Sequence, residues 1–192
     1  MKPSTPSHIW PWIGAFGGAG VLVWQLGLEP GPLLDPAKVG WLNLAALWFH
    51  QFEEYVWPGG FQKFFNEHIY RPQGPLSVRL SGRAILLVNV PIAWSAYLLG
   101  AFGGEQALPL LAGLLGISFL NGCLHLALAL GLRRYNPGVL TGALLFIPLA
   151  AGALREWVRA GLFTTDMLPF ALALAIGGTA AIPLSIYLAR DP

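Results

Sequence analysis

Residues 108–132 read LPLLAGLLGISFLNGCLHLALALGL, a run of 25 residues without one charged side chain. A helix needs about 20 mostly apolar residues to cross the hydrocarbon core of a bilayer. This run therefore predicts a membrane-spanning helix. Two polar side chains, Asn121 and His125, interrupt its second half. They are four residues apart, so both face the same side of such a helix.

The composition of the whole chain agrees with a lipid environment. Of its 192 residues, 55% are hydrophobic and only 10% are charged, with a mean hydropathy of +0.60. Soluble domains carry about 25% charged residues, so a chain this apolar cannot cover itself with a polar surface in water. A net charge of +2 without a basic stripe excludes nucleic-acid binding. Cys123 is the only cysteine, which excludes an intrachain disulfide and a cysteine-based zinc motif.

Apolar runs of similar length recur along the chain. We expect an all-α polytopic membrane protein, a single transmembrane domain over residues 1–192 that forms a bundle of about six transmembrane helices. The first run is too long for the core of a signal peptide, and no small-residue cleavage site follows it, so we interpret it as a retained span. The expected spans cover residues 9–28, 39–57, 84–102, 108–132, 138–158 and 167–189.

The basic residues are divided unevenly between the two sides of this topology. One side carries eight of the eleven, and the other carries Lys38, Arg155 and Arg159. Basic loops stay preferentially in the cytoplasm, so we expect both termini there, a location in the inner cell membrane, and membrane lipids as partners. The eight residues are Lys2, Lys63, Arg71, Arg79, Arg83, Arg133, Arg134 and Arg190.

The longest connection, between the second and third spans, predicts a short interfacial helix over residues 60–70. Five mostly apolar side chains fall on one face of that helix, and polar side chains take the other face. A helix of this kind lies in the plane of the membrane surface. The five side chains are Phe61, Phe64, Phe65, His68 and Ile69.

The second expected span carries a polar stripe. Glu53 and Glu54 follow His50 by three and four residues, so the three side chains share one face of a helix. Asn43 lies two turns earlier on that face. Ionisable groups inside a membrane are costly and usually face the interior of a bundle, where they serve a function. In the alternative interpretation, the two carboxylates lie at the interface and pair with arginines.

The topology places polar groups from three spans at one depth. At about 1.5 Å per residue, His50 and His125 each lie about 10 Å, and Asn89 about 8 Å, from the cytoplasmic ends of their spans. This convergence predicts one polar site in the cytoplasmic half of the bilayer. The supporting polar groups are Asn43, Asn89 and Asn121.

Imidazole nitrogens and carboxylates together are suitable ligands for zinc, iron or manganese. We expect His50, His125 and one of Glu53 and Glu54, with Glu54 as the preferred ligand, to hold a divalent metal, zinc or iron, with open coordination positions. Glu53 and Glu54 are the candidate catalytic residues, since the glutamate that is not a ligand is free to act as general base. His68 would be a further ligand if the apolar face of the interfacial helix turned inward. A di-iron centre is disfavoured, because such bundles use about four carboxylates and two Glu-x-x-His motifs.

Three short motifs follow one another along this framework: H-x-x-E-E at residues 50–54, N-x-x-x-H at 121–125 and Y-x-P-G at 135–138. In this order they resemble the HXXEE-domain family, a group of membrane proteins of unknown function. The resemblance covers most of the chain, from Ala46 to the sixth span, and implies no reaction. We interpret the last motif as a structural turn. The defining positions that the resemblance implies are His50, Glu53, Glu54, Asn121, His125, Tyr135, Pro137 and Gly138.

The polar site leads to three functional hypotheses. The first is a membrane-embedded, metal-dependent enzyme, with hydrolysis as the simplest reaction, acting on a lipid or other apolar substrate. The second is a small proton- or cation-coupled transporter that uses the same residues. It predicts polar groups continuing towards the outer face, where spans two to four offer only Asn43, Ser95 and Ser118. The third is a non-catalytic accessory protein of the membrane.

Overall fold

The computed structural model describes residues 9–70 and 79–188. These residues form helices joined by short connections, and no strand occurs in this part of the chain. Three of the basic residues that set the expected orientation, Lys2, Arg71 and Arg190, lie outside the described residues.

The helices follow the apolar runs closely. Several contain a segment of wider π-type winding, marked η, and the helices run without a break through these segments. The order is α1 (Ile9–Leu22) with η1 (Val23–Leu28), α2 (Pro36–Tyr55), α3 (Phe61–Phe64) with η2 (Phe65–Ile69), α4 (Gly82–Leu87) with η3 (Val88–Trp94) and α5 (Ser95–Gly103), the 3₁₀ turn η4 (Gly104–Ala107), α6 (Leu108–Leu132), α7 (Val139–Thr141) with η5 (Gly142–Phe146) and α8 (Ile147–Arg159), and α9 (Leu168–Leu188).

Local chemistry explains where the helices begin and end. The Asp35 side chain accepts a hydrogen bond from the Ala37 amide, and Pro36 occupies the first turn, so α2 starts three residues before the predicted span. Gly104, with φ +51°, reverses the chain between α5 and α6. Arg133 takes a left-handed conformation and ends α6.

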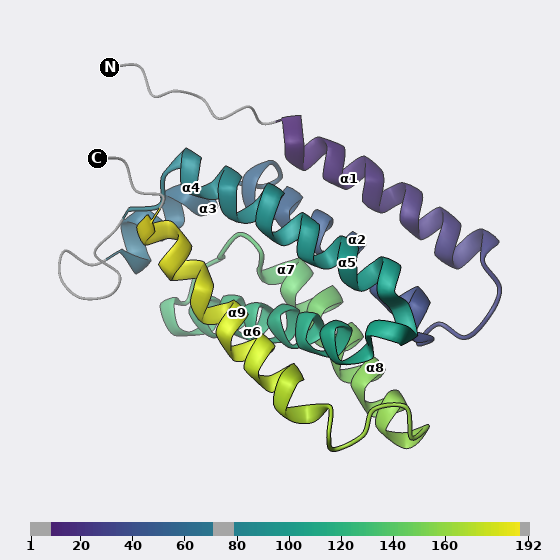
Figure 1. Cartoon of the computed structure of the whole chain (residues 1–192). Coiled ribbons are helices and arrows are strands. Elements are labelled where there is room, and N and C mark those ends of the chain that lie inside the picture. The colour runs from purple at the N-terminus through teal and green to yellow at the C-terminus, as the bar shows by residue number, and fades with distance from the viewer. Residues whose placement is uncertain (1–8, 71–78, 189–192) are drawn as a thin grey trace.

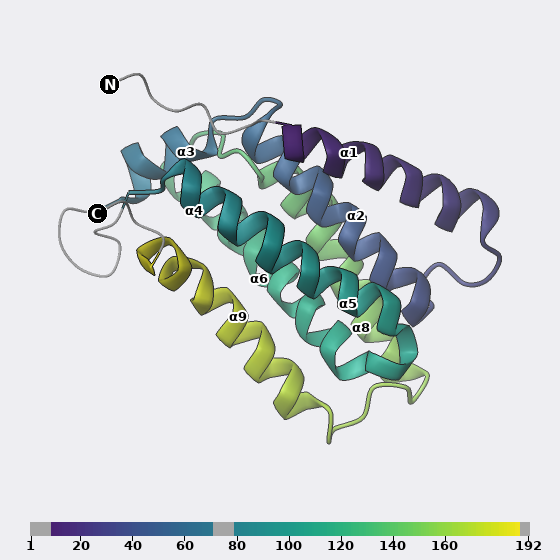
Figure 2. The same ribbon diagram turned by 45° about the horizontal axis from the view of Figure 1, so that its top comes forward.

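Helix α2 lies at the centre of the bundle. It contacts α1, α5, α6, α7 and α8, and most of its side chains are buried. Figures 1 and 2 show α1 along one flank and α9 along the other, where α9 packs against α6. We call the two ends of the bundle the α3 end, where α3 meets the α6–α7 turn, and the Gly104 end, where η4 meets the start of α2.

Within the residues that the structure describes, three helical stretches are long and apolar enough to cross a membrane. They are Ile9–Leu28, Gly82–Leu132 and Val139–Arg159, and Leu168–Leu184 is a shorter apolar helix. Gly82–Leu132 contains two of the predicted spans, because the chain folds back at Gly104. Helix α2 is not in this group, because charged and polar side chains lower its hydropathy. Neighbouring helices cover those side chains instead.

Glycines bring two pairs of helices close together. An added Cβ at Gly14 would lie 3.0 Å from Trp48 Cδ1, so α1 rests directly on α2. An added Cβ at Gly122 would lie 2.8 Å from the Gly142 oxygen, where α6 crosses η5. Contacts this close need small residues.

The expected helix over residues 60–70 is present as α3 and η2. Phe64 and Phe65 are buried, whereas Lys63 and Glu67 are exposed, so the apolar face turns towards the bundle. Asn66 Nδ2 donates to the Leu80 carbonyl, and the Leu80 amide donates back to Asn66 Oδ1. These bonds fasten α3 and η2 to the segment before α4.

Candidate metal centre

Two histidines and one glutamate meet inside the bundle near the α3 end. His50 and Glu54 lie one turn apart on α2, and His125 lies on α6. Their exposed fractions are 2%, 5% and 4%. Each offers one ligand atom, and these atoms lie within 4.8 Å of one another, so the group can hold a metal ion. It is the only such group of three among the residues that the structure describes.

The distances within this group suit a shared ion better than direct hydrogen bonds. Glu54 Oε1 lies 3.7 Å from His50 Nε2 and 3.5 Å from His125 Nε2. Hydrogen bonds of this type span about 2.7–3.2 Å. Two ligands about 2.0–2.1 Å from a tetrahedral zinc ion lie about 3.3–3.4 Å apart, which is close to the two distances from Glu54, whereas the group as a whole spans up to 4.8 Å. His50 Nε2 is also buried without a hydrogen-bond partner, as a ligand atom without its ion would be.

Glu53, which directly precedes Glu54 in the chain, has different surroundings. Its Oε1 accepts hydrogen bonds from the Tyr135 hydroxyl at 2.6 Å and the Leu140 amide at 3.0 Å. Its Oε2 accepts from the Thr141 amide at 2.7 Å and the Thr141 hydroxyl at 2.5 Å. Donors from the segment after α6 therefore occupy both oxygens, and the carboxylate fastens the start of α7 to α2.

Thr141 links Glu53 to His50. The threonine hydroxyl has one hydrogen, which it donates to Glu53, so its oxygen must accept from His50 Nδ1, 2.8 Å away. His50 therefore carries its proton on Nδ1, and the lone pair of Nε2 points to Glu54 and His125. Thr141 could not be identified from the sequence, because no pattern marks a threonine in the first turn of an apolar helix.

The Tyr135–Gly138 segment is a turn, as expected, and it also shapes the site. Gly138 has φ +102°, and an added Cβ there would lie 2.6 Å from His125 Cε1 and 2.7 Å from His50 Cε1. Pro137 beside it is buried. Burial and the hydrogen bond to Glu53 raise the pKa of Tyr135, so its hydroxyl stays protonated as a donor. The turn thus supplies a clamp for one glutamate and a small residue against both imidazoles.

Asn89 belongs to a hydrogen-bond network next to this group. Its Oδ1 accepts from Gln51 Nε2 at 3.0 Å, and its Nδ2 donates to the Ile85 carbonyl at 2.8 Å. Gln51 Oε1 in turn accepts from Trp94 Nε1 at 2.8 Å. Asn89 Nδ2 also donates to the Tyr55 hydroxyl at 3.4 Å, and Tyr55 hydrogen-bonds Glu54. The network therefore joins α2 to η3 and reaches the metal group at Glu54. Gln51, which is 1% exposed, was not singled out from the sequence, because its neighbours Glu53 and Glu54 dominate the motif.

Asn43 and Asn121 occupy two further positions. Asn43 Oδ1 accepts from Ser118 Oγ at 2.9 Å, and Ser118 is 2.8 Å from the Tyr97 hydroxyl. This cluster lies two turns from His50 along α2, away from the metal group. Asn121 lies one turn before His125, and its Oδ1 is buried without a hydrogen-bond partner.

His68 does not join His50, Glu54 and His125. It lies on η2 with its Nε2 2.9 Å from Arg134 Nη1, at the rim of the α3 end. The face that carries it does turn inward, but Phe64 and Phe65 form the buried part of that face.

A cavity of about 380 Å³ adjoins the metal group and reaches it at Glu54 and His125. Its polar lining also includes Tyr55, Asn89 and Asn121, and the remainder is almost entirely apolar. The apolar lining comes from α3, η2, α4, η3, α6 and α9: Phe61, Phe65, Ile69, Leu80, Ala84, Ile85, Val88, Leu124, Leu128, Ile182, Pro183 and Ile186.

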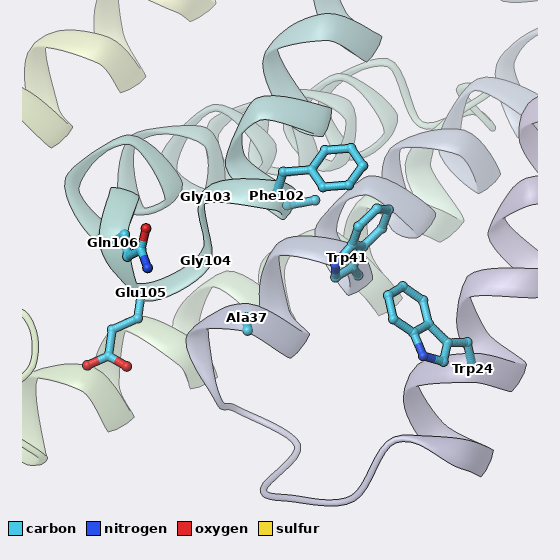
Figure 3. A pocket seen from close by; sticks show the side chains of 9 residues that line it. Trp24, Ala37, Trp41, Phe102, Gly103, Gly104, Glu105 and Gln106 are labelled. Carbon is cyan, nitrogen blue, oxygen red and sulfur yellow. The ribbon is translucent and has the colours of Figure 1, made fainter.

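A second hollow, of about 750 Å³, lies at the Gly104 end. Figure 3 shows Trp24, Trp41 and Phe102 in a row on one side of it and Glu105 on the other. The rings stack edge to face, with centroids 5.1 Å and 4.9 Å apart. The hollow contains no group of metal-binding side chains among the described residues. Aromatic rows of this kind are typical of membrane interfaces.

These features define a class: an all-helical protein with membrane-spanning candidate helices around a buried His/Glu group. The chain belongs to the family described as proteins of unknown function with an HXXEE motif, whose family model matches residues 41–153, more than half of the chain. The resemblance found in the three motifs is thereby confirmed. Comparisons with curated proteins and with solved structures gave no match.

Proposed function

We propose that this protein is a membrane-embedded, metal-dependent enzyme that hydrolyses a lipid or other apolar substrate. The observation that carries the proposal is the burial of His50, Glu54 and His125 side by side, with distances from Glu54 to the two imidazoles that are too long for hydrogen bonds and close to those between zinc ligands. The residues fit the ion chemically as well, because two imidazoles and one carboxylate are suitable ligands for zinc or iron.

The proposed centre leaves coordination positions open. Three protein ligands around a zinc ion are the pattern of catalytic sites, whereas structural sites use four. An ion bound there would act as a Lewis acid on a carbonyl or phosphoryl oxygen. The cavity borders the group at Glu54 and His125, so a substrate has room beside it.

The two glutamates have different roles in this proposal. Glu54 Oε1 faces both imidazoles and serves as ligand, which leaves its second oxygen to accept a proton. Glu53 is a positioning residue, because donors already occupy both of its oxygens. Through Thr141 it keeps the proton of His50 on Nδ1.

We further propose that the chain crosses the membrane six times, with the α3 end in the cytoplasm. The described basic residues at that end outnumber those at the Gly104 end, which are Lys38, Arg155 and Arg159. The central position of α2 allows it to cross in spite of its polar side chains, because other helices shield them from lipid.

Metal content of the purified protein tests the centre. We expect about one equivalent of zinc or iron per chain in the wild type, and almost none after His50→Ala or His125→Ala. His68→Ala is the matched control, since that histidine lies outside the group, and it should keep the metal. Equal metal content in all four proteins, or none in the wild type, would contradict the metal centre.

The reaction needs a separate test. The metal-loaded protein in nanodiscs that contain both monoacyl and diacyl lipid esters should release fatty acid or headgroup, detected by mass spectrometry of the lipids. Glu54→Gln should abolish the release. A full metal content with no product from any lipid class would reject hydrolysis and keep the metal centre.

One observation favours transport as a second candidate. The buried Asn43, Ser118 and Tyr97 cluster extends the polar groups of α2 beyond the histidines towards the Gly104 end. Transport predicts proton or cation flux into liposomes that is lost on Asn43→Leu as well as on Glu54→Gln. Hydrolysis predicts no flux.

A further inference from the structure

The cavity next to the metal group has one polar wall and one apolar wall. Its polar side chains come from α2, η3 and α6, whereas α3, η2, α4 and α9 contribute almost only hydrocarbon. Thr179 of α9 is the one polar residue that these four segments contribute to the lining. Its hydroxyl donates to the Ala175 carbonyl at 2.7 Å, so that hydrogen is used within its own helix.

The carboxamide of Asn121 is a polar group that the fold leaves available. It lines the cavity, its Oδ1 is buried without a partner, and no hydrogen bond of this side chain occurs within the described residues. An unsatisfied buried polar group costs about 1–3 kcal/mol. A ligand hydroxyl, which both donates and accepts, would offset that cost.

The dimensions of the cavity restrict the ligand. A volume of about 380 Å³ lies near the lower end of the about 300–1,000 Å³ of small-molecule sites. It suits one hydrocarbon chain and leaves no room for a second. On the side of α4 and η3, α9 makes few contacts, whereas it packs closely on α6. The contact beside the cavity is therefore loosest between α9 and α4, where only apolar side chains meet.

We propose that this cavity binds the hydrocarbon chain of a single-chain lipid ester with a free hydroxyl, of the monoacylglycerol type. The inference rests on the proposed hydrolase function and names its substrate class. The ester would lie at Glu54 and His125, with the hydroxyl at Asn121. In the reaction, water adds to the ester carbon, the bond from that carbon to the alkoxy oxygen breaks, and the alcohol takes the proton. The products are a fatty acid and glycerol.

Photo-crosslinking tests the occupant. The full-length protein is placed in nanodiscs that contain a monoacylglycerol with a diazirine in its chain, or the matching diacylglycerol. We expect the monoacyl probe to label Leu128 or Ile186 and the diacyl probe to label only lipid-facing positions. The methyl ester of the same acid lacks the hydroxyl and should label about threefold to tenfold less, the effect of one hydrogen bond. Asn121→Leu should remove that difference.

Two phenylalanine variants on α9 provide the matched pair. Thr179→Phe fills the cavity and should reduce labelling by the monoacyl probe about tenfold. Ile176→Phe points outward from the same helix, where the side chain is 62% exposed, and should leave the labelling unchanged. Leu128→Trp, on the opposite wall, repeats the test if Thr179→Phe does not fold.

The outcomes separate this inference from the metal centre. Labelling that is lost in Thr179→Phe while the metal content stays normal supports the chain-binding cavity. Labelling of cavity residues in a wild type without metal keeps the cavity and rejects the metal centre. Equal labelling by the monoacyl and diacyl probes, or labelling that Thr179→Phe and Leu128→Trp leave unchanged, overturns the inference.

Discussion

Glu53 and Glu54 are adjacent in the chain, yet they belong to two different regions of the molecule. The Glu53 region is a closed set of hydrogen bonds with Tyr135, Leu140 and Thr141. The Glu54 region consists of two imidazoles at non-bonding distances, the Tyr55 hydroxyl that hydrogen-bonds Glu54, and a cavity. Four protein donors surround the Glu53 carboxylate, whereas Glu54 has the Tyr55 hydroxyl and keeps lone pairs for an ion or a substrate. We therefore propose a structural role for Glu53 and a metal-binding role for Glu54.

The largest expected effect is on metal binding at Glu54. Glu54→Gln removes one of three proposed ligands, so metal affinity should fall by more than the about 10–100-fold that loss of an outer hydrogen-bond partner causes. The free energy of unfolding of the metal-free protein should change little, because the glutamine fits the same space. Competition with a chelator measures the affinity. A variant that binds metal as tightly as the wild type would remove Glu54 from the centre.

Glu53→Gln should have the opposite pattern. The glutamine amide places a donor against the Thr141 amide or hydroxyl, so the free energy of unfolding should fall by about 2–4 kcal/mol. Thermal unfolding in detergent, followed by tryptophan fluorescence, measures the change. Glu67→Gln is the control, since that side chain is 52% exposed on η2. Equal stability of the two variants would show that the hydrogen bonds of Glu53 do not hold α7 in place.

Gly138→Ala tests the contact between the turn and the two imidazoles. The new Cβ would meet both rings at a left-handed backbone position, so we expect a loss of about 1–3 kcal/mol of stability together with weaker metal binding. Gly161→Ala shares the positive φ but has no atom within 4 Å of the added Cβ. Gly161→Ala should therefore lose stability but keep its metal affinity. Unchanged metal affinity in Gly138→Ala would separate the turn from the centre.

The smallest expected effect concerns the link between the two regions. Thr141→Val keeps the shape but removes the hydroxyl that holds the proton of His50 on Nδ1, so metal affinity should fall about tenfold. Thr141→Ser should restore it. Isothermal titration with zinc measures both variants. Identical affinities for valine and serine would mean that the hydroxyl does not orient the histidine.

The sequence predicted the helices well because their limits depend on local chemistry. The expected spans 9–28 and 108–132 coincide with helices, since apolar length, Gly104 and the left-handed Arg133 are readable along the chain. The proximity of His50 and Glu54 followed from a spacing of four residues. The proximity of His125 to His50 and Glu54 required only that α2 and α6 place these side chains at a similar depth in the bundle.

The division between the two glutamates could not be predicted in this way. It depends on which side of α2 meets the α6–α7 turn, and that rotation is fixed by contacts between distant segments. Thr141 lies 88 residues from Glu53, and Gly138 contacts rings from two other helices. The position of His68 could not be predicted either, because its partner Arg134 belongs to the same distant turn.

The X-ray absorption spectrum of the zinc-loaded protein tests the central claim most directly. We expect two imidazole nitrogens and at least one carboxylate oxygen at about 2.0–2.1 Å from the zinc. The spectrum should lose one imidazole in His125→Ala and should be unchanged in Glu53→Gln that still folds. A spectrum without imidazole scattering, or one that Glu53→Gln alters as much as Glu54→Gln does, would contradict the proposed centre and the separate roles of the two glutamates.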